Sequence, residues 1–480
     1  MPVAPTYRPE TIHARLGDAF FDPVDAANFP EHKLRFRNDR WAARVGLGEL
    51  DDAEWVTHFG RFAPLPDNLP KPLALRYHGH QFRHYNPDIG DGRGFLFAQL
   101  RDDARRLLDL GTKGSGRTPY SRTGDGRLTL KGGVREILAT EMLEALGVNT
   151  SKTFSLIETG EALERGDEPS PTRSAVLVRL NHSHIRIGTF QRLAAYGETD
   201  EIKRLVDHGI EHYWPEAAND PDPVIGFYRR VVDAVATMGA QWMAAGFVHG
   251  VLNTDNITIT GESFDYGPWR FIPEVDPGFT AAYFDQTGLY AFGRQPQALE
   301  WNLARLAECL LDLAEQEKLQ LGLQLFRPVF QRTFGAAVLA RLGLASADSE
   351  SDAALARELF EALHATRAPF EQSIHDLVGG GLPDRLASSP NAAVYERSEM
   401  AGVLGLLRDR RQVAGVDDAL AAPMSKGQPP TLLIDEVETL WSAIAERDDW
   451  TPLERKIQKM RAYGAWRSSF ASLPNAATDV

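Results

Sequence analysis

The strongest constraint on the fold is a polar segment, residues 249–256, which is followed nine residues after Asn256 by Asp265. Both side chains carry the hard oxygen ligands that Mg²⁺ prefers, and a Mg²⁺ site usually takes only one or two carboxylates from the protein. Residues 257–264 are short and partly apolar, a pattern typical of a strand hairpin. We therefore expect a hairpin that returns the chain and brings Asn256 and Asp265 together.

A glycine cluster and two strand patterns lie upstream of this segment. Residues 95–100 are a nearly continuous apolar run, and residues 105–110 form a second strand pattern, so the two are expected to pair as an antiparallel hairpin. Residues 90–94, Gly-Asp-Gly-Arg-Gly, precede the first strand. Such glycines allow a backbone to approach phosphates closely, although a tight hairpin also requires glycine.

The second strand leads to Lys113, and residues 131–146 then carry apolar side chains at helical spacing. Glu136 lies one turn into this helix. A strand lysine paired with a glutamate on the following helix positions the ATP phosphates in kinases, so we expect Lys113 and Glu136 to pair. Residues 111–118 nearly match a P-loop, but Arg117 replaces the lysine of that motif and no helix follows. The P-loop interpretation is therefore rejected.

Two arginines follow the next predicted strands. Arg179 and Arg186 have the planar guanidinium that suits bidentate phosphate recognition, and surface salt bridges are the alternative explanation. The same segment contains His182 and His184. Because no carboxylate lies near them at metal-ligand spacing, these histidines are interpreted as structural residues.

The order of these features is the order found in kinases. A kinase places a catalytic-loop asparagine before an Asp-Phe-Gly aspartate, and both hold Mg²⁺ on the ATP phosphates. Here Asn256 precedes Asp265-Tyr-Gly. Val251, however, occupies the place of the aspartate that serves as the base in small-molecule kinases, and Asp255 is the remaining candidate proton acceptor. The sequence therefore favours a kinase-like fold with altered chemistry.

The predicted fold class is α+β, with the two-lobed arrangement of protein kinases. We predict an N-terminal arm over residues 1–72 and a small sheet-bearing lobe over residues 73–182. A larger helical lobe with the catalytic and metal loops spans residues 183–320, and a helical C-terminal extension follows over residues 321–480. The polar motifs gather where the two lobes would meet, which is a preferred place for a nucleotide site.

Composition excludes several classes of protein. The chain has 52 Lys and Arg against 66 Asp and Glu, a formal net charge of −14, so a nucleic-acid partner is not expected. No stretch approaches the ~18 apolar residues of a membrane span, and the start has no secretory pattern, so no membrane association is expected. With one cysteine, Cys309, no intramolecular disulfide can form. These features predict a cytoplasmic location.

Several long strings resemble the selenoprotein O family, the kinase-like protein adenylyltransferases. The resemblance covers roughly residues 25–310 and is carried by residues 77–82, 110–122, 135–136, 183–186, 246–256, 265–268, 285–292 and 301–303. It implies transfer of AMP from Mg-ATP to Ser, Thr or Tyr hydroxyls of proteins, with pyrophosphate released and Mn²⁺ as the alternative metal. The nucleotide would be flipped relative to a kinase.

The resemblance also implies a role for each matching site residue. Gly90, Gly92 and Arg93 would belong to the nucleotide loop, and Lys113, Arg179 and Arg186 would bind phosphates. Asp125 and Gly126 would make further contacts with the nucleotide. Asp255 would accept the proton, and Asn256 and Asp265 would bind the metal. Glu136 would orient Lys113. Two rivals remain, a kinase that transfers the γ-phosphate with Asp255 as base and a pseudokinase scaffold that only binds ATP.

The chain departs from the family pattern at three places. Arg83 stands where the family usually has glycine, and the helix with Glu136 opens on the unusual sequence Lys131-Gly-Gly. Longer members end in a selenocysteine or cysteine, whereas this sequence ends in residues 475–480 without one. The family's redox control through the tail is therefore not carried over to this chain, and Cys309 is predicted to be a buried core residue.

Overall fold

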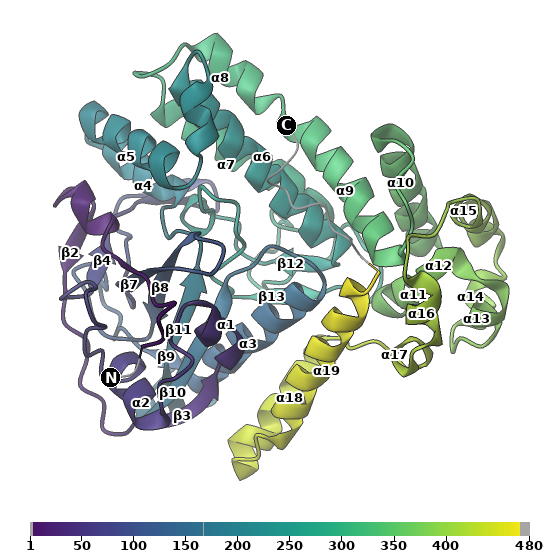
Figure 1. The fold of residues 1–480 in the computed structure, drawn as a ribbon, viewed down its shortest axis with the longest axis horizontal. Helices are drawn as coiled ribbons and strands as arrows, with labels where there is room; N and C mark the ends of the chain where they lie inside the picture. Colours follow the sequence, from purple (N-terminus) through teal and green to yellow (C-terminus); the bar gives the residue numbers. More distant parts are fainter. Residues whose placement is uncertain (1–2, 167, 471–480) are drawn as a thin grey trace.

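The computed structural model describes residues 3–166 and 168–470, and the N-terminal part of the chain forms a nine-stranded antiparallel sheet at one side of the molecule (Figure 1). The main strand order is β2-β4-β7-β8-β11-β10-β3, with β1 paired to β7 and β9 paired to β11. The strands are β1 (Pro9–Glu10), β2 (Phe21–Pro23), β3 (Lys33–Arg37), β4 (Leu73–Leu75), β7 (Leu96–Arg101), β8 (Leu107–Lys113), β9 (Leu128–Thr129), β10 (Lys152–Leu163) and β11 (Thr172–Asn181).

The segment predicted as an N-terminal arm contributes β1, β2 and β3 to this sheet. Its short helices are η1 (His13–Leu16), α1 (Asp39–Arg44) and α2 (Asp52–Phe59). Trp55 of α2 stacks on Phe154 of β10 with ring centroids 4.9 Å apart, so the arm covers one face of the sheet with aromatic side chains. Residues 1–2 of the predicted arm and 471–480 of the predicted extension lie outside the described residues.

The predicted hairpin and the helix after it are confirmed. β7 and β8 pair antiparallel, with Arg101 opposite Leu107, and β8 ends at Lys113. The helix is α3 (Leu130–Ala145). Its glycine-rich opening has a structural reason, because a Cβ on Gly133 would lie 2.3 Å from the side chain of Leu156. Glycine lets α3 pack closely against β10 and places its buried face beside the end of β8.

Helices dominate the rest of the chain, and Figure 1 shows α4 to α9 to one side of the sheet. They are α4 (Ile187–Ala195), α5 (Thr199–His212), η2 (Pro215–Asn219), α6 (Pro223–Ala244), η3 (Thr254–Asn256), η4 (Phe292–Arg294), α7 (Gln295–Cys309), α8 (Gln316–Leu323) and α9 (Phe326–Leu342). The hairpin β5 (Gly79–Gln81) and β6 (His84–Asn86) is separate from the main sheet.

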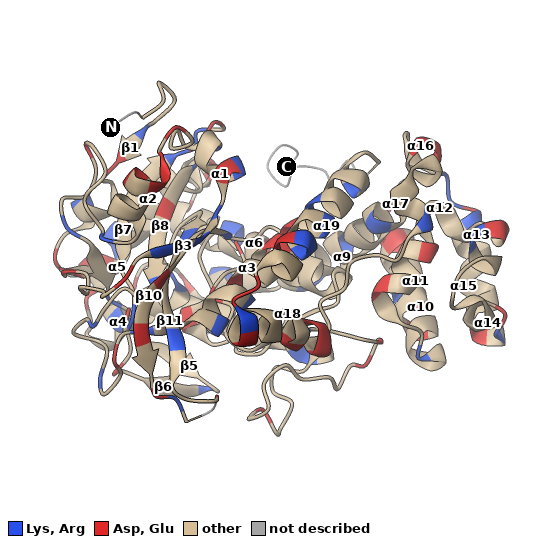
Figure 2. Cartoon of the chain, turned by 90° about the horizontal axis from the view of Figure 1, so that it is seen from below, with Lys and Arg blue, Asp and Glu red and all other residues tan. Residues whose placement is uncertain are grey.

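The C-terminal region is helical, as predicted. It contains α10 (Ser349–Thr366), α11 (Phe370–Asp376), α12 (Val378–Gly381), α13 (Pro383–Ala387), α14 (Ala392–Tyr395), α15 (Ser398–Arg408), α16 (Val416–Ala421), α17 (Pro423–Lys426), α18 (Ile434–Arg447) and α19 (Thr451–Ser468). The last of these helices returns to α3, where Arg461 forms an ion pair with Glu141. Figure 2 shows basic and acidic residues mixed along the elements.

The prediction of a strand hairpin over residues 257–264 is wrong. That segment forms only isolated bridges to neighbours, Thr258 to Arg186 and Ser263 to Thr150. The strand pair lies on either side of it, between β12 (Phe247–His249) and β13 (Trp269–Phe271). The local apolar pattern misled because those side chains are buried in the core rather than paired across a hairpin.

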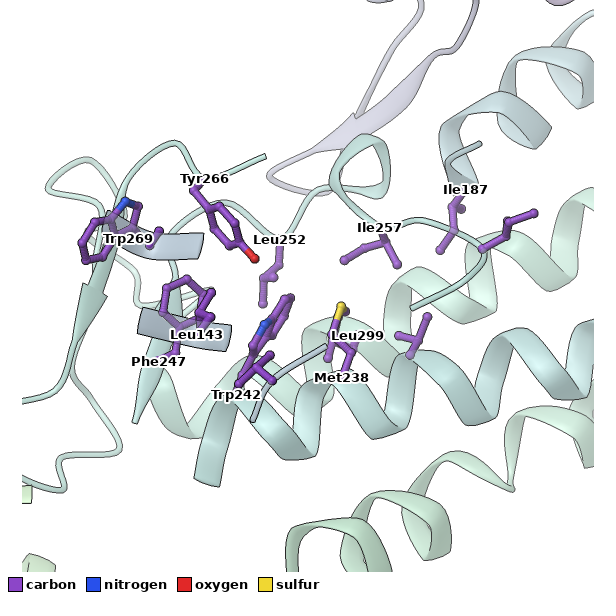
Figure 3. Close-up of a cluster of buried hydrophobic side chains, with 14 of the residues drawn as sticks. Leu143, Ile187, Met238, Trp242, Phe247, Leu252, Ile257, Tyr266, Trp269 and Leu299 are labelled. Atoms are coloured by element: carbon purple, nitrogen blue, oxygen red, sulfur yellow. The ribbon is translucent and has the colours of Figure 1, made fainter. Parts of the chain in front are cut away.

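An apolar cluster lies beneath the chain between residues 252 and 269 (Figure 3). Leu252 and Ile257 extend from the loop, and Tyr266 and Trp269 follow Asp265; all four are almost fully buried. They pack with side chains from several helices and from β12, namely Leu143, Ile187, Met238, Trp242, Phe247 and Leu299. The polar residues between these anchors are therefore held by packing on both sides.

Cys309 ends α7 and is 7% exposed, which confirms its prediction as a core residue. Burial raises the pKa of its thiol to about 12, so the thiolate is strongly disfavoured. In the described part of the chain, no helix is long and apolar enough to cross a membrane.

Candidate active site

A polar cleft of about 720 Å³ opens where the ends of β8 and β11 face the loop of residues 249–256. Its size suits a small-molecule ligand. Seven basic and five acidic side chains line it: Arg93, Lys113, Arg122, Arg127, Arg165, Arg179 and Arg186, and Asp91, Asp125, Glu164, Asp255 and Asp265. The cleft is thus locally basic although the chain carries a net charge of −14, and this balance favours an anionic ligand.

Lys113 is the centre of the charge network. Its Nζ lies 2.5 Å from Oε1 of Glu136 and 2.8 Å from Oδ1 of Asp265. The first contact confirms the predicted pairing of strand lysine and helix glutamate. Burial alone would raise the pKa of Asp265, but Lys113, Arg179 and Arg186 hold it well below the usual range. Asp265 is therefore a permanent carboxylate on the cleft wall.

Arg179 is oriented by a buried hydrogen-bonded chain. Its Nη1 donates to Oδ1 of Asp265 at 3.1 Å, and its Nε donates to Nε2 of His184 at 3.2 Å. On the other side of the ring, His184 Nδ1 lies 3.3 Å from Oδ2 of Asp109. Burial lowers the pKa of His184, and a neutral ring that accepts at Nε2 must carry its proton at Nδ1. A Cβ on Gly111 would lie 2.3 Å from His184 Nε2, so glycine makes room for this ring.

Arg186 is held by rings and a carboxylate. Its side chain is 2% exposed and its Nη1 donates to Oδ1 of Asp91 at 3.0 Å. The guanidinium lies 4.2 Å from the ring centroid of Tyr77 and 5.2 Å from that of Phe264. Its Nε is buried and has no hydrogen-bond partner in the described part of the chain. A group so confined presents a fixed positive charge to the cleft.

The glycine cluster folds against the segment that faces it. A Cβ on Gly90 would lie 2.5 Å from the ring of Tyr120, and a Cβ on Gly94 would lie 2.1 Å from the carbonyl oxygen of Thr112. These two glycines thus have a packing reason as well as a place on the cleft wall. Gly92 and the exposed Arg93 also line the cleft.

Asp125 and Gly126 also line the cleft. Arg165 donates to both oxygens of Asp125, at 2.8 and 3.1 Å. Burial would raise the pKa of Asp125, yet this arginine and the backbone N–H of Arg127 lower it. Gly126 has a φ of 73°, and a Cβ there would lie 2.3 Å from the backbone of Gly116. Only glycine fits this close crossing of two backbones.

Asp255 differs from the other carboxylates of the cleft. Its Oδ1 is buried without a hydrogen-bond partner among the described residues, and burial raises its pKa to about 6. The adjacent Thr254 is fixed, because its hydroxyl donates to Gln191 Oε1 at 2.5 Å and accepts from the backbone N–H of His80 at 2.7 Å. Asp255 therefore combines a fixed backbone with a weakly acidic carboxylate that keeps one unsatisfied oxygen, and these are properties of a proton acceptor.

Asn256 is next to Asp255 but is not among the residues that line the cleft. Its Nδ2 donates to the backbone carbonyl of Val251 at 3.0 Å, which leaves its Oδ1 without a hydrogen bond to the described residues. No cluster of three His, Cys, Asp or Glu side chains that could hold a metal ion occurs in residues 3–166 and 168–470. Any cation here would depend on one carboxylate, one amide and ligand oxygens.

The whole-chain comparisons agree on one family. A sequence model of the family described as protein adenylyltransferase SelO matches residues 5–461. A protein nucleotidyltransferase YdiU from Synechocystis sp. is 44% identical over 480 aligned residues, covering 95% of this chain and 98% of the relative. A protein with the same name from Gloeobacter violaceus is 44% identical, and the match covers 94% of this chain and 94% of that protein. Another from Cereibacter sphaeroides is 38% identical, and the match covers 87% of this chain and 90% of that protein. The chain belongs to the SelO family.

The SelO-family cleft gathers most of the residues that the sequence analysis selected. Ten of them line it: Gly90, Gly92, Arg93, Lys113, Asp125, Gly126, Arg179, Arg186, Asp255 and Asp265. Two do not. Glu136 lies behind Lys113 as its ion-pair partner, and Asn256 contacts the backbone of Val251.

Several cleft residues of this SelO-family chain were missed from the sequence. Asp91 stands inside the glycine cluster, where a carboxylate between two glycines was a usable signal. Arg165 and Tyr120 gave no such signal, because their roles depend on long-range contacts with Asp125 and Gly90. The role of His184 as a partner of Arg179 was also missed, although its interpretation as a structural residue is consistent with its burial.

Proposed function

We propose that this SelO-family chain transfers AMP from ATP to Ser, Thr or Tyr hydroxyls of proteins. The observation that carries the proposal is the division of charge in the cleft. Lys113, Arg179 and Arg186 supply a fixed basic wall, whereas Asp255 supplies a carboxylate with one unsatisfied oxygen and position 251 is valine. Such a site can bind a polyphosphate, and its proton acceptor stands at a position other than that of the usual kinase base.

In the proposed reaction, the acceptor hydroxyl oxygen attacks the α-phosphorus of ATP. The bond from that phosphorus to the oxygen bridging to the β-phosphate breaks, and pyrophosphate leaves. The hydroxyl proton passes to Asp255, the carboxylate whose pKa of about 6 suits proton transfer near neutral pH. Arg179 and Arg186 would bind the departing phosphates, since their guanidinium groups are already oriented by His184 and Asp91.

Lys113 would bind the phosphates beside them, with Glu136 keeping its ammonium group in place. Gly90, Gly92 and Arg93 would form the nucleotide loop. Asp125 and Gly126 would contact the rest of the nucleotide.

Asn256 and Asp265 are the proposed ligands of a divalent cation, Mg²⁺ with Mn²⁺ as the alternative. The donor set fits, because the Oδ1 of Asn256 makes no hydrogen bond to the described residues and Asp265 stays ionised. Oxygen donors of this kind suit both metals. When bound, the cation would neutralise phosphate charge and orient the leaving group.

We infer that the layout is that of a two-lobed protein kinase. The sheet and α3, over residues 73–182 with the arm of residues 1–72, would form the small lobe. Residues 183–320 would form the helical lobe, and residues 321–480 the extension. The pairing of Lys113 on β8 with Glu136 on α3 supports this assignment, as does the position of Asp255 and Asp265 on the loops that follow α6.

Intact-mass analysis separates the proposal from its rivals. The protein is incubated with ATP, a divalent cation and a mixture of unmodified proteins. Acceptors that gain the mass of an adenylyl group support the proposal. Gain of a phosphoryl group alone would favour the kinase, and binding of ATP without any gain of mass would favour the pseudokinase scaffold.

A further inference from the structure

Two exposed aromatic side chains lie in the irregular segment after Asp265. Tyr283 is 83% exposed and Phe284 is 47% exposed. Their rings form an edge-to-face pair with centroids 5.1 Å apart. Single exposed apolar residues are common on protein surfaces, so the significance of this pair depends on what it contacts.

The pair is connected to the loop that carries Asp255. The ring of Phe284 lies 5.8 Å from that of Phe82, which in turn lies 5.0 Å from that of Tyr290. The backbone N–H of Phe82 and the hydroxyl of Tyr290 both donate to Oδ1 of Asn253, at 3.1 and 2.9 Å. Asn253 precedes Asp255 by two residues. Phe284 is therefore connected through Phe82 to the loop that carries the proposed proton acceptor, and Tyr283 packs on Phe284.

An exposed cation, Arg83, lies in the turn between β5 and β6. Arg83 has a φ of 64°, a conformation that is unfavourable for an ordinary side chain and that glycine adopts freely. Its guanidinium lies 5.5 Å from the ring centroid of Trp301. Arg83 forms no ion pair within the described residues.

The conformation of Arg83 alone does not mark a binding surface. Arg105, in the turn between β7 and β8, has a φ of 65° and is also exposed. What distinguishes Arg83 is its location, because the adjacent Phe82 bonds Asn253 and the backbone N–H of His80 bonds Thr254. A cation and an aromatic pair thus border the same loop.

We propose that Arg83, Tyr283 and Phe284 form an acceptor-docking surface for the protein substrate. Its occupant is a segment that carries the reactive hydroxyl with a large apolar side chain and a carboxylate nearby. The rings would cover the apolar side chain, and the guanidinium, which has no acidic partner of its own among the described residues, would bind the carboxylate. The inference rests on the proposed function, since it places the acceptor protein beside Asp255.

The test uses ATP labelled at the α-phosphate and peptide libraries with one fixed Ser, Thr or Tyr and varied flanking positions. The wild-type protein should select Asp or Glu and large apolar residues at defined positions. Arg83→Gly should lose the acidic selection, and Tyr283→Ser with Phe284→Ser should lose the apolar selection. Each should lower kcat/KM for the selected peptide about tenfold, the size of one good interface contact. The affinity for ATP should not change.

Arg105→Gly is the matched control, because it makes the same replacement at the same backbone conformation away from the cleft. It should keep both selections. Labelling without selection, or unchanged selection in the variants, overturns the docking surface. If label enters cellular proteins but no peptide, the same variants are compared on those proteins, and equal labelling overturns it. If no peptide or protein takes up α-label, the proposed function itself fails.

Discussion

The two walls of the cleft satisfy their charges in opposite ways. The sheet wall comprises Lys113 on β8, Arg179 on β11 and Arg186 just before α4, and each of these predicted phosphate-binding cations has a partner. Lys113 pairs with Glu136 and Asp265, Arg179 with Asp265, and Arg186 with Asp91. On the loop wall, one oxygen of Asp255 has no hydrogen-bond partner among the residues that the structure describes. The paired wall is preorganised for an anion, whereas the unpaired carboxylate retains the capacity to accept a proton.

This difference predicts separable defects. Changes on the sheet wall should weaken the binding and positioning of the nucleotide. Changes at Asp255 should slow transfer while binding is kept. Asp265 belongs to both functions, because it pairs with the sheet-wall cations and is a proposed metal ligand.

Asp265→Asn should therefore have the largest effect. It removes the negative charge that a cation would bind and leaves Lys113 and Arg179 without their shared carboxylate. We expect transfer to fall by at least ~10³-fold, since metal ions carry much of the charge stabilisation in phosphoryl-type transfer. The measurement is the initial rate of AMP incorporation with Mg²⁺ and with EDTA.

Asp276→Asn, at an exposed carboxylate beyond β13, is the control and should keep the wild-type rate. Equal wild-type rates with Mg²⁺ and with EDTA would rule out the metal role.

Asp255→Asn should come next. It keeps the size of the side chain but removes the proton acceptor, and general-base catalysis is typically worth ~10²–10⁴-fold in rate. The rate constant for transfer should fall within that range, while titration shows little change in the affinity for ATP with the metal.

Val251→Asp serves as the companion variant, because it restores an aspartate at the place of the kinase base. In the Asp255→Asn background it should not rescue transfer, since the proposed acceptor hydroxyl lies elsewhere. A wild-type rate for Asp255→Asn would show that the loop wall supplies no base and acts by position and charge alone.

Arg186→Lys should weaken nucleotide binding by about 10- to 100-fold, the size of a lost charge-assisted hydrogen bond. Lysine keeps the charge but not the planar fork between Asp91 and the rings of Tyr77 and Phe264. Arg179→Lys should behave alike. Titration with ATP measures the effect, and Arg192→Lys on α4 is the control, because its Nη1 bonds the backbone carbonyl of Ala19 outside the cleft. Wild-type affinity in both site variants would exclude the phosphate role.

His184→Phe should have the smallest effect, an increase of about tenfold in the KM for ATP, because His184 acts only through the orientation of Arg179. His184→Gln, which offers an acceptor oxygen, should recover part of the loss. His182→Phe is the control, since its Nδ1 contacts the carbonyl of Leu107 and it is not bonded to Arg179.

The nitrogen NMR signals of His184 give a readout that packing alone would not move. They should report a neutral ring protonated at Nδ1. A ring protonated at Nε2 instead would contradict its role as the hydrogen-bond acceptor of Arg179.

Local signals were sufficient to predict much of the sheet wall. The strand that ends at Lys113, the helix that carries Glu136 and the two arginines each have a pattern within a few residues. Pairings between distant segments had no such signal. β3 joins the sheet beside β10, and Asp91 binds Arg186 across 95 residues of sequence. The prediction of a hairpin at residues 257–264 failed for another reason. In a short segment, burial in the core and strand pairing give similar apolar patterns.

The central claim is that the cleft transfers the α-phosphorus of ATP with its adenosine. The most direct test incubates the wild-type protein and Asp255→Asn with acceptor proteins and either α- or γ-labelled ATP. The account predicts that wild-type protein incorporates label only from α-labelled ATP, that Asp255→Asn loses this incorporation, and that neither incorporates γ-label. Incorporation from γ-labelled ATP alone would contradict it and would identify a kinase.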